Sequence, residues 1–291
     1  MEQNILDFIT YLREVKGSSP NTIQAYQADL NKLCMFLAKQ ENISVTTISE
    51  TNLNSYVLHL EKEGYSPASV SRNISTIKAF FLFLLKRGKI ANDPSERLSP
   101  PKVTRKPPEF LGTKEMNKLL QQPDLNTPKG IRDKAILELL YATGIKVSEL
   151  VSLKVQDLNL KMKYITCVGK NERNIPIGKK ARNALEQYLN IRQETFNKRN
   201  IDYLFLNTSG EKLSRQGLWK ILKEYALSAE IDGINPNKIR QTFAMHLLNN
   251  GADLESVREF MGHNDIMTTQ QYLTHSYTNS RAVYEKTHPR A

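Results

Sequence analysis

The stretch "NPNKIRQTFAMHLLNNG", residues 235–251, carries the start and stop signals of one amphipathic helix. Asn235 is a residue type that caps helix N-termini, and Pro236 suits the first helical position. The free backbone amides at such a helix start attract anions, and Asn237 and Arg240 lie one turn apart beside them. An arginine near a helix start is more often solvated or ion-paired. This stretch alone therefore leaves both a phosphate site and an ordinary surface charge open.

The residues around this helix predict an α-rich domain with a small sheet. The segment "GIRDKAILELLYATG" has the apolar content of a buried helix that ends at Gly144. Two runs of strand-favouring residues, "KYITCVG" and "RNIPIG", are joined by "KNE" and predict a small hairpin. Further helices are predicted over residues 179–197, 214–229, 236–250 and 253–261.

The first part of the chain predicts a four-helix bundle. Apolar residues recur with helical spacing in four segments, at about residues 5–12, 23–37, 50–63 and 67–87. The following stretch, "SPPKVTRKPP", holds four prolines and three basic side chains, which is the composition of a semi-rigid linker. The sequence thus predicts a mainly α protein with a small antiparallel sheet. Its predicted parts are a helical domain, a linker and an α-rich domain with the sheet, at residues 1–98, 99–108 and 109–291.

Charge and composition favour a soluble protein with a polyanionic partner. Lys and Arg outnumber Asp and Glu by 41 to 30 among 291 residues, which gives a net charge of +11. A basic surface that serves only solubility is the alternative. The longest apolar run, residues 79–85, is far shorter than the roughly 18 residues that cross a bilayer. Because the N-terminus also lacks a signal-peptide pattern, we expect a cytoplasmic protein without a membrane partner.

The cysteines and histidines do not predict a metal site. Cys34 and Cys167 lie far apart without a neighbouring partner, so buried free thiols are expected. The histidines include no pair at the i, i+4 spacing of metal ligands. We therefore expect no metal.

Five segments together resemble the tyrosine recombinase family, specifically its Xer-type and integrase-like bacterial members. They are "SPNTIQAYQADL" from 19, "ATGIKVSELVSLKVQDLN" from 142, "VGKNERNIP" from 168, the helix at 236, and "LLNNGADLESVREFMGHNDIMTTQQYLTH" from 247. Their order and spacing span nearly the whole chain. The resemblance implies a core-binding domain and a catalytic domain that enclose double-stranded DNA as a C-shaped clamp. It also implies strand exchange within a tetramer through a 3′-phosphotyrosyl intermediate, without a metal or nucleotide cofactor.

The resemblance assigns a chemical role to several side chains. Tyr272 matches the nucleophile, and its alternative role is that of a half-buried packing tyrosine. Lys170 matches the general acid that protonates the departing oxygen, in a turn about two residues shorter than the family's usual one. Arg240 matches an arginine whose planar fork holds two phosphate oxygens. His263 matches a histidine or tryptophan that contacts the phosphate, with a helix C-terminal cap as the alternative. Glu149 matches an acidic residue expected to orient the pocket.

Two positions depart from the family pattern. Lys146 stands where the family has its first arginine, and a lysine replaces a bidentate fork with a point charge. Asn237 stands where the family has histidine or lysine, and its amide cannot exchange a proton near pH 7. Lys146 has three possible explanations: a native residue with compensation elsewhere, drift toward binding without cleavage, or a deliberate substitution. Strand cleavage is expected to be slow, whereas DNA binding rests on many contacts and should survive.

The sequence leaves two functional hypotheses. The first is a site-specific tyrosine recombinase, and the second is a DNA-binding regulator on the same fold with catalysis lost. The resemblance further predicts that Val283 and Tyr284 dock into a neighbouring protomer, with a frayed tail as the alternative. The target sequence cannot be inferred, because several basic side chains could contact either bases or phosphates. Candidates are Arg72, Lys78, Arg215 and Lys220.

Overall fold

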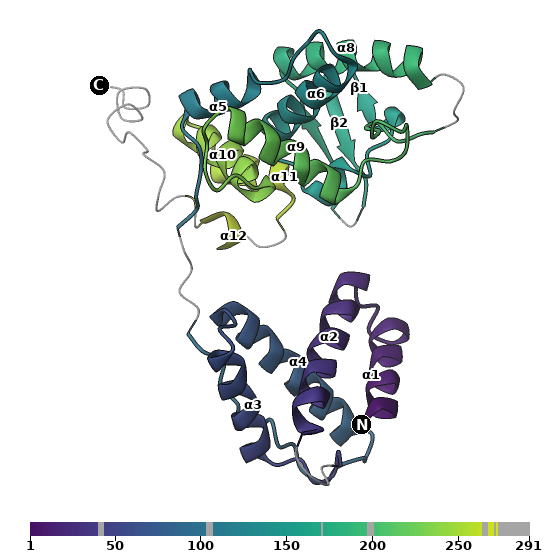
Figure 1. The fold of residues 1–291 in the computed structure, drawn as a ribbon, viewed down its shortest axis with the longest axis vertical. Helices are drawn as coiled ribbons and strands as arrows, with labels where there is room; N and C mark the ends of the chain where they lie inside the picture. Colours follow the sequence, from purple (N-terminus) through teal and green to yellow (C-terminus); the bar gives the residue numbers. More distant parts are fainter. Residues whose placement is uncertain are drawn as a thin grey trace. The chain divides into compact units, whose positions relative to one another are not determined.

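The chain forms two compact units, Met1–Arg105 and Lys106–Ala291 (Figure 1). A computed structural model describes residues 1–39, 44–102, 107–169, 171–196, 201–263, 267–270 and 272. Part of the expected linker, residues 103–106, lies outside these ranges. The finer division at residues 98 and 109 stays a prediction.

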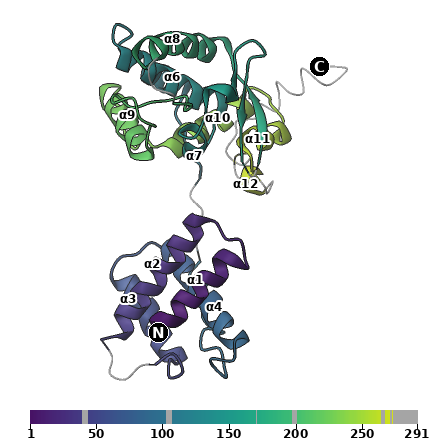
Figure 2. The same cartoon turned by 90° about the vertical axis from the view of Figure 1, so that its right-hand side faces the viewer.

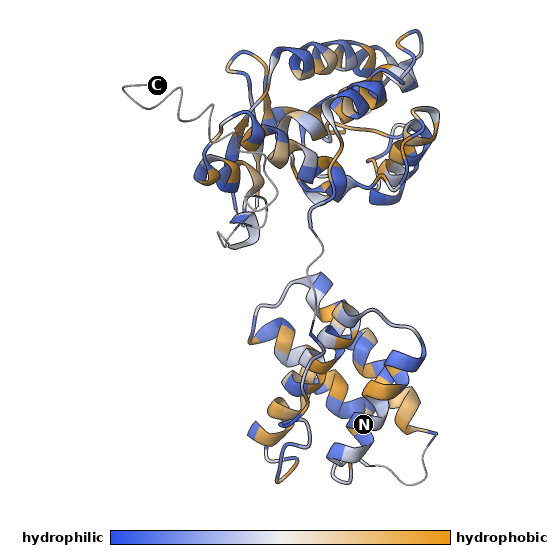
Figure 3. Ribbon diagram, turned by 90° about the vertical axis from the view of Figure 1, so that its left-hand side faces the viewer, coloured by the Kyte–Doolittle hydropathy of each residue, from blue (hydrophilic) through white to orange (hydrophobic). Residues whose placement is uncertain are grey.

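The first unit consists of the four predicted helices, three of which begin with a capping residue visible in the sequence. They are α1 (Glu2–Glu14), α2 (Pro20–Leu37), α3 (Glu50–Lys62) and α4 (Pro67–Lys86). Ser19, Ser49 and Ser66 precede α2, α3 and α4, and each side chain accepts a hydrogen bond from a backbone N–H in the first turn. The apolar stripes alternate with hydrophilic faces along these helices (Figure 3). The predicted helical bundle is therefore confirmed.

The stripes of the first unit meet in one core that is rich in aromatic rings. Phe8, Phe80 and Phe81 are at most 1% exposed, and Phe8 lies edge-on to Phe80 with ring centroids 5.5 Å apart. By length and composition alone, α4 could cross a membrane. Core helices of soluble proteins share these properties, and α4 places its apolar stripe in this core. Its hydrophobicity is thus accounted for by packing within the unit.

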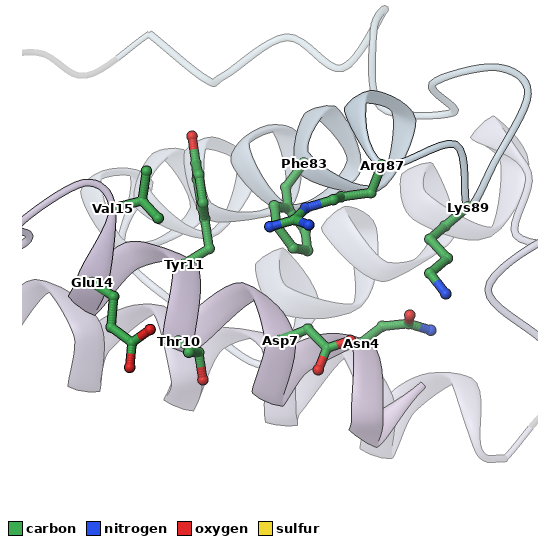
Figure 4. Close-up of a pocket in the computed structure, with 9 residues that line it drawn as sticks. All are labelled: Asn4, Asp7, Thr10, Tyr11, Glu14, Val15, Phe83, Arg87 and Lys89. Carbon is green, nitrogen blue, oxygen red and sulfur yellow. The ribbon is translucent and has the colours of Figure 1, made fainter.

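A surface groove of the first unit lies between α1 and the end of α4 (Figure 4). Asp7 and Glu14 on α1 provide acidic groups, and Arg87 and Lys89 provide basic groups. The guanidinium carbon of Arg87 lies 5.6 Å from the centre of the Phe83 ring, in a cation–π contact. All residues that line this groove come from the first unit, with acidic side chains on α1 and basic side chains at and after the end of α4.

The second unit is built around the buried helix α6, on which three other helices of the unit pack, with α8 alongside it (Figure 2). Its larger helices are α5 (Thr113–Leu120), α6 (Pro128–Thr143), α8 (Lys179–Phe196), α9 (Arg215–Ser228), α10 (Pro236–Asn249) and α11 (Leu254–Met261). Its short elements are α7 (Val147–Leu150), the 3₁₀ turn η1 (Val155–Asp157) and α12 (Met267–Gln270). α8 and α10 both pack against α6, which places the α6 C-terminus beside α10.

A small antiparallel sheet flanks this helical core. Its strands β1 (Leu158–Asn159), β2 (Tyr164–Cys167) and β3 (Arg173–Pro176) pair in sequence order. The pairing of Ile165 with Ile175 places both side chains, which are at most 1% exposed, on the core face. The predicted hairpin is confirmed, and β1 is an additional strand.

The buried charges of α6 are paired within the core. Asp133 is fully buried and accepts hydrogen bonds from Arg132 at 2.8 Å and from the Tyr225 hydroxyl at 3.0 Å. The ammonium group of Lys129 lies 3.2 Å from the same carboxylate. Because a buried charge without a partner is strongly destabilising, this network fixes α6 and hence the position of its end.

Candidate active site

Arg240 on α10 is the residue around which the candidate site is organised. Asn235 caps α10 by accepting a hydrogen bond from the Lys238 backbone N–H at 2.9 Å, as the sequence predicted. One turn later, Arg240 is only 8% exposed. Its guanidinium donates to the carbonyl oxygens of Gly144, at the end of α6, and Met261, at the end of α11. The planar fork of one arginine therefore joins three helices.

The end of α6 comes this close to α10 because residue 144 is a glycine. Gly144 has φ +57, the left-handed conformation in which a side chain is strained. A Cβ atom at this position would overlap the ring of Phe243 on α10. The predicted helix end at Gly144 is therefore confirmed. The chain that follows it places Lys146 at the site.

The last carbonyl groups of α11 gather the basic side chains of the site. Carbonyl oxygens at a helix C-terminus lack partners within the helix and carry the negative end of its dipole. Arg173 donates through Nε to the Phe260 carbonyl at 2.8 Å, next to the Met261 carbonyl that Arg240 occupies. Lys146 donates through Nζ to the Gly262 carbonyl at 3.3 Å. Three cations from three elements thus converge on one helix end.

Glu149 balances part of this positive charge. Its carboxylate accepts two hydrogen bonds of 3.0 Å from Arg173 and one of 2.8 Å from the Lys146 backbone N–H. Burial alone would raise the pKa of Glu149, but these hydrogen bonds outweigh it and hold the pKa below its ordinary value. The Lys146 ammonium lies 4.0 Å from the same carboxylate. Burial lowers the pKa of Lys146, and the charges of Arg240 and Arg173 add to this effect while Glu149 opposes it.

His263 follows the end of α11 and is held by α12. Its Nδ1 atom is hydrogen-bonded to the Thr269 hydroxyl at 2.9 Å. Burial lowers the pKa of His263 to about 4, and the charges of Arg240, Lys146 and Arg173 act in the same direction. The imidazole is therefore neutral at pH 7, where it can still donate one hydrogen bond.

Acidification is expected to destabilise the second unit through His263. A histidine in the unfolded chain binds a proton below about pH 6.5, whereas the folded site binds one only below about pH 4. Within this window the unfolded state binds more protons, so stability is lost as the pH falls. Between pH 7 and pH 5, wild type should lose roughly 1 to 2 kcal/mol more than His263→Gln.

Fluorescence of Trp219, the only tryptophan of the chain, would follow urea unfolding of the second unit at each pH. Equal losses in the two proteins would contradict the neutral imidazole.

Tyr272 lies in a small apolar cluster beside Arg240. Its side chain is 3% exposed and packs with Phe243 of α10 and Met261 of α11. Its backbone N–H donates to the Thr269 carbonyl at 3.0 Å, so Thr269 contacts both Tyr272 and His263. Met261, which packs against Tyr272, also accepts a hydrogen bond from Arg240 through its carbonyl, so the tyrosine and the arginine are neighbours. Burial in the apolar cluster matches the packing role, and the neighbouring Arg240 guanidinium matches the role of nucleophile.

The remaining candidates are placed differently. Asn237 is exposed on the first turn of α10, whereas Arg240 is buried. Lys170 lies outside the described residues, as do Val283 and Tyr284. The structure therefore brings together Lys146, Arg240, His263 and Tyr272 among the residues that it describes.

Two residues of this site were not predicted from the sequence. Arg173 and Ile175 lie two residues apart on the buried face of β3. A basic residue on a buried strand face needs a charged or polar partner, and this was the signal in the sequence. Thr269 carried no signal of its own, because its role depends on contacts with residues before and after it.

Comparison with known proteins identifies the same two units. The model of the phage integrase family matches residues 109–279, and that of the phage integrase N-terminal SAM-like domain matches residues 5–88. Tyrosine recombinase XerD of Listeria innocua is 42% identical over 298 residues, which cover 100% of each chain.

Two solved structures share the fold. XerH recombinase bound to a palindromic difH substrate has a TM-score of 0.75 at 19% identity, with 98% of this chain and 88% of that chain covered. A lambda integrase dimer bound to a COC' core site has a TM-score of 0.75 at 15% identity, with 94% of each chain covered. The family predicted from the sequence is thus confirmed. The chain belongs to the phage integrase family and is a tyrosine recombinase, an enzyme of site-specific DNA recombination.

Proposed function

We propose that this chain cuts and rejoins duplex DNA with Tyr272 as the nucleophile. The phenol oxygen attacks the scissile phosphorus, a 3′-phosphotyrosyl bond forms, and the 5′ oxygen leaves with a proton. A 5′ hydroxyl of another strand then attacks the phosphotyrosyl bond, restores the phosphodiester and frees the phenol. The observation that carries this proposal is the convergence of Arg240, Lys146 and His263 beside Tyr272 at the end of α11.

The charges of the site suit this reaction. Negative charge builds up on the non-bridging oxygens of the phosphate in the transition state, and fixed cations there lower the barrier. Arg240 and Lys146 supply positive charge, and neutral His263 supplies a hydrogen-bond donor. Asn237 is the remaining candidate donor, at the exposed opening of α10. Lys170 is assigned as the general acid from the family pattern. These side chains provide the charge and the proton, so the proposed reaction needs no metal or nucleotide cofactor.

Assembly and location complete the proposal. Exchange of strands between two duplexes requires four cleavages, so we infer a tetramer of this chain on double-stranded DNA. Residues 1–98 form the core-binding domain, residues 99–108 the linker and residues 109–291 the catalytic domain in this proposal. A DNA substrate supports a location in the cytoplasm.

The test is covalent capture of the protein on DNA. A duplex selected from a random-sequence library by binding to the full chain would be nicked near the cleavage site, so that the short product diffuses away. The expected result is a protein–DNA adduct that survives denaturation. The absence of an adduct, both for wild type and for Lys146→Arg, would overturn the proposal.

A regulator that binds DNA without cutting it is the second candidate. Lys146 and Asn237 favour it, because each replaces a family residue with a weaker group for phosphate chemistry. Such a protein would select a DNA sequence in the same library but would form no adduct. The two candidates therefore separate in one experiment.

Arg72 in the first unit is expected to contact DNA. Its guanidinium is fixed by two hydrogen bonds to the buried carboxylate of Asp29, at 2.9 and 2.8 Å, while 48% of its side chain stays exposed. If it neutralises a phosphate, Arg72→Gln should weaken binding and reduce the slope of log affinity against log salt by about 1. Asp29→Asn should weaken binding with the slope retained, because the guanidinium charge remains. Unchanged affinity and slope for Arg72→Gln would contradict the contact.

A further inference from the structure

We propose that Arg173 is a positioning residue for strand cleavage, which holds the Glu149 carboxylate so that the Lys146 ammonium stays available to the phosphate. This proposal rests on the proposed function, because it assigns Arg173 a part in the same reaction. Arg173 acts through Glu149 and the end of α11.

The contacts of Arg173 use its whole guanidinium group. Nη1 and Nη2 each donate to one Glu149 oxygen at 3.0 Å, Nε donates to the Phe260 carbonyl at 2.8 Å, and Nη1 also approaches the Asn171 carbonyl at 3.3 Å. The side chain is 6% exposed. A planar fork can satisfy all of these acceptors at once, whereas a lysine ammonium cannot span them.

The space around Arg173 is shaped for it. Gly262 has φ +59 directly after α11, and a Cβ atom there would lie 2.7 Å from Nη1 of Arg173. The glycine thus leaves room for the guanidinium between β3 and the segment that continues to His263. Arg173 is therefore built into the site and is not a surface charge that happens to lie close.

Two cations, Lys146 and Arg173, lie within ion-pair distance of the Glu149 carboxylate. The Lys146 ammonium lies 4.0 Å from Oε1 of Glu149, and Arg173 holds both oxygens of that carboxylate at 3.0 Å. Without Arg173, the partly buried carboxylate would lack its main partner, and such a group strongly favours a remaining counter-charge. The Lys146 ammonium would then be drawn onto Glu149, and its charge would be lost to the transition state.

This competition predicts a rescue that loss of structure alone would not produce. Arg173→Met should cleave DNA at least tenfold more slowly than wild type at saturating DNA, with a dissociation constant within about twofold. Adding Glu149→Gln to Arg173→Met should raise the cleavage rate again, because the neutral amide no longer captures Lys146. The rate would be measured in single turnover on the nicked duplex selected by binding.

A second, partly buried arginine of the same unit serves as the control for lost stability. Arg192 donates to the carbonyls of Ile201 and Tyr203 at 2.6 and 2.7 Å, so Arg192→Met loses comparable hydrogen bonds away from the site. It should cleave at the wild-type rate at temperatures where it is folded. If Arg173→Met does not fold, the same rescue is expected for Arg173→Gln with and without Glu149→Gln, because the polar amide at 173 also leaves Glu149 without this counter-charge.

The outcomes separate this proposal from the one on which it rests. Suppose that wild type cleaves DNA. The role of Arg173 would then be overturned if Arg173→Met cleaved at the wild-type rate, or if adding Glu149→Gln to Arg173→Met did not raise its rate. The proposed function would stand in both cases. If wild type forms no adduct, the proposed function fails, and the role of Arg173 in cleavage fails with it.

Discussion

Tyr272→Phe is expected to abolish the covalent adduct and to leave DNA affinity within about twofold. The substitution removes the attacking oxygen, and loss of a nucleophile costs roughly 10⁴-fold or more in rate. It retains the ring that packs against Phe243 and Met261, so the fold should be kept. Gel analysis of the denatured reaction with the nicked duplex would measure the adduct.

Tyr277→Phe is the matched control, since it is another tyrosine, five residues further along the chain. It should form the adduct at the wild-type rate. If the adduct were lost in Tyr277→Phe and kept in Tyr272→Phe, the nucleophile would be Tyr277. A biological effect unchanged by Tyr272→Phe would instead support the DNA-binding regulator.

Lys146→Arg is expected to accelerate cleavage by about 100-fold, the effect of one well-placed donor in a transition state. The Lys146 ammonium already donates to the Gly262 carbonyl and lies 4.0 Å from Glu149, so its single charge serves several acceptors. A guanidinium has five N–H donors and can hold a carbonyl and a phosphate oxygen together. Single-turnover cleavage rates would measure the gain.

Lys154→Arg provides the matched control for this change. The Lys154 ammonium lies 3.9 Å from the exposed carboxylate of Asp202. Lys154→Arg therefore makes the same lysine-to-arginine change in an ion pair on the surface. It should leave the rate unchanged. A Lys146→Arg protein no faster than wild type would favour compensation elsewhere in the native site. A large gain would favour drift or deliberate substitution.

The fold was predictable where local signals repeat over several turns. The stripes of α2 and α4, and the proline and serine at their starts, define those helices without tertiary information. The elements α7, α12 and β1 have two to four residues each, which is too short for a period to be recognised. α5 and α11 have eight residues each, but only α11 has a side-chain cap at its start, Asp253, whereas α5 follows Gly112, so α5 was not predicted.

The site was predictable through the family motifs but not in its contacts. The motifs supplied Arg240, Lys146 and His263, and the structure places these three together. No local pattern could show that Arg240 donates to carbonyls 96 and 21 residues away, or that Arg173 pairs with a glutamate 24 residues earlier. Such contacts depend on tertiary packing. The burial of Tyr272 is likewise a property of the folded cluster.

The gathering of three basic side chains at the end of α11 has a consequence for synthesis of the protein. At this helix end, hydrogen bonds close loops of 116 residues from Lys146 to Gly262 and 87 residues from Arg173 to Phe260, and Arg240 also closes one of 96 residues through Gly144 at the end of α6. Distant pairings of this kind form late, because loop closure is entropically costly. A nascent or half-folded chain thus has no assembled phosphate pocket. The capacity to cleave DNA therefore arises only once the whole second unit has been synthesised and has folded.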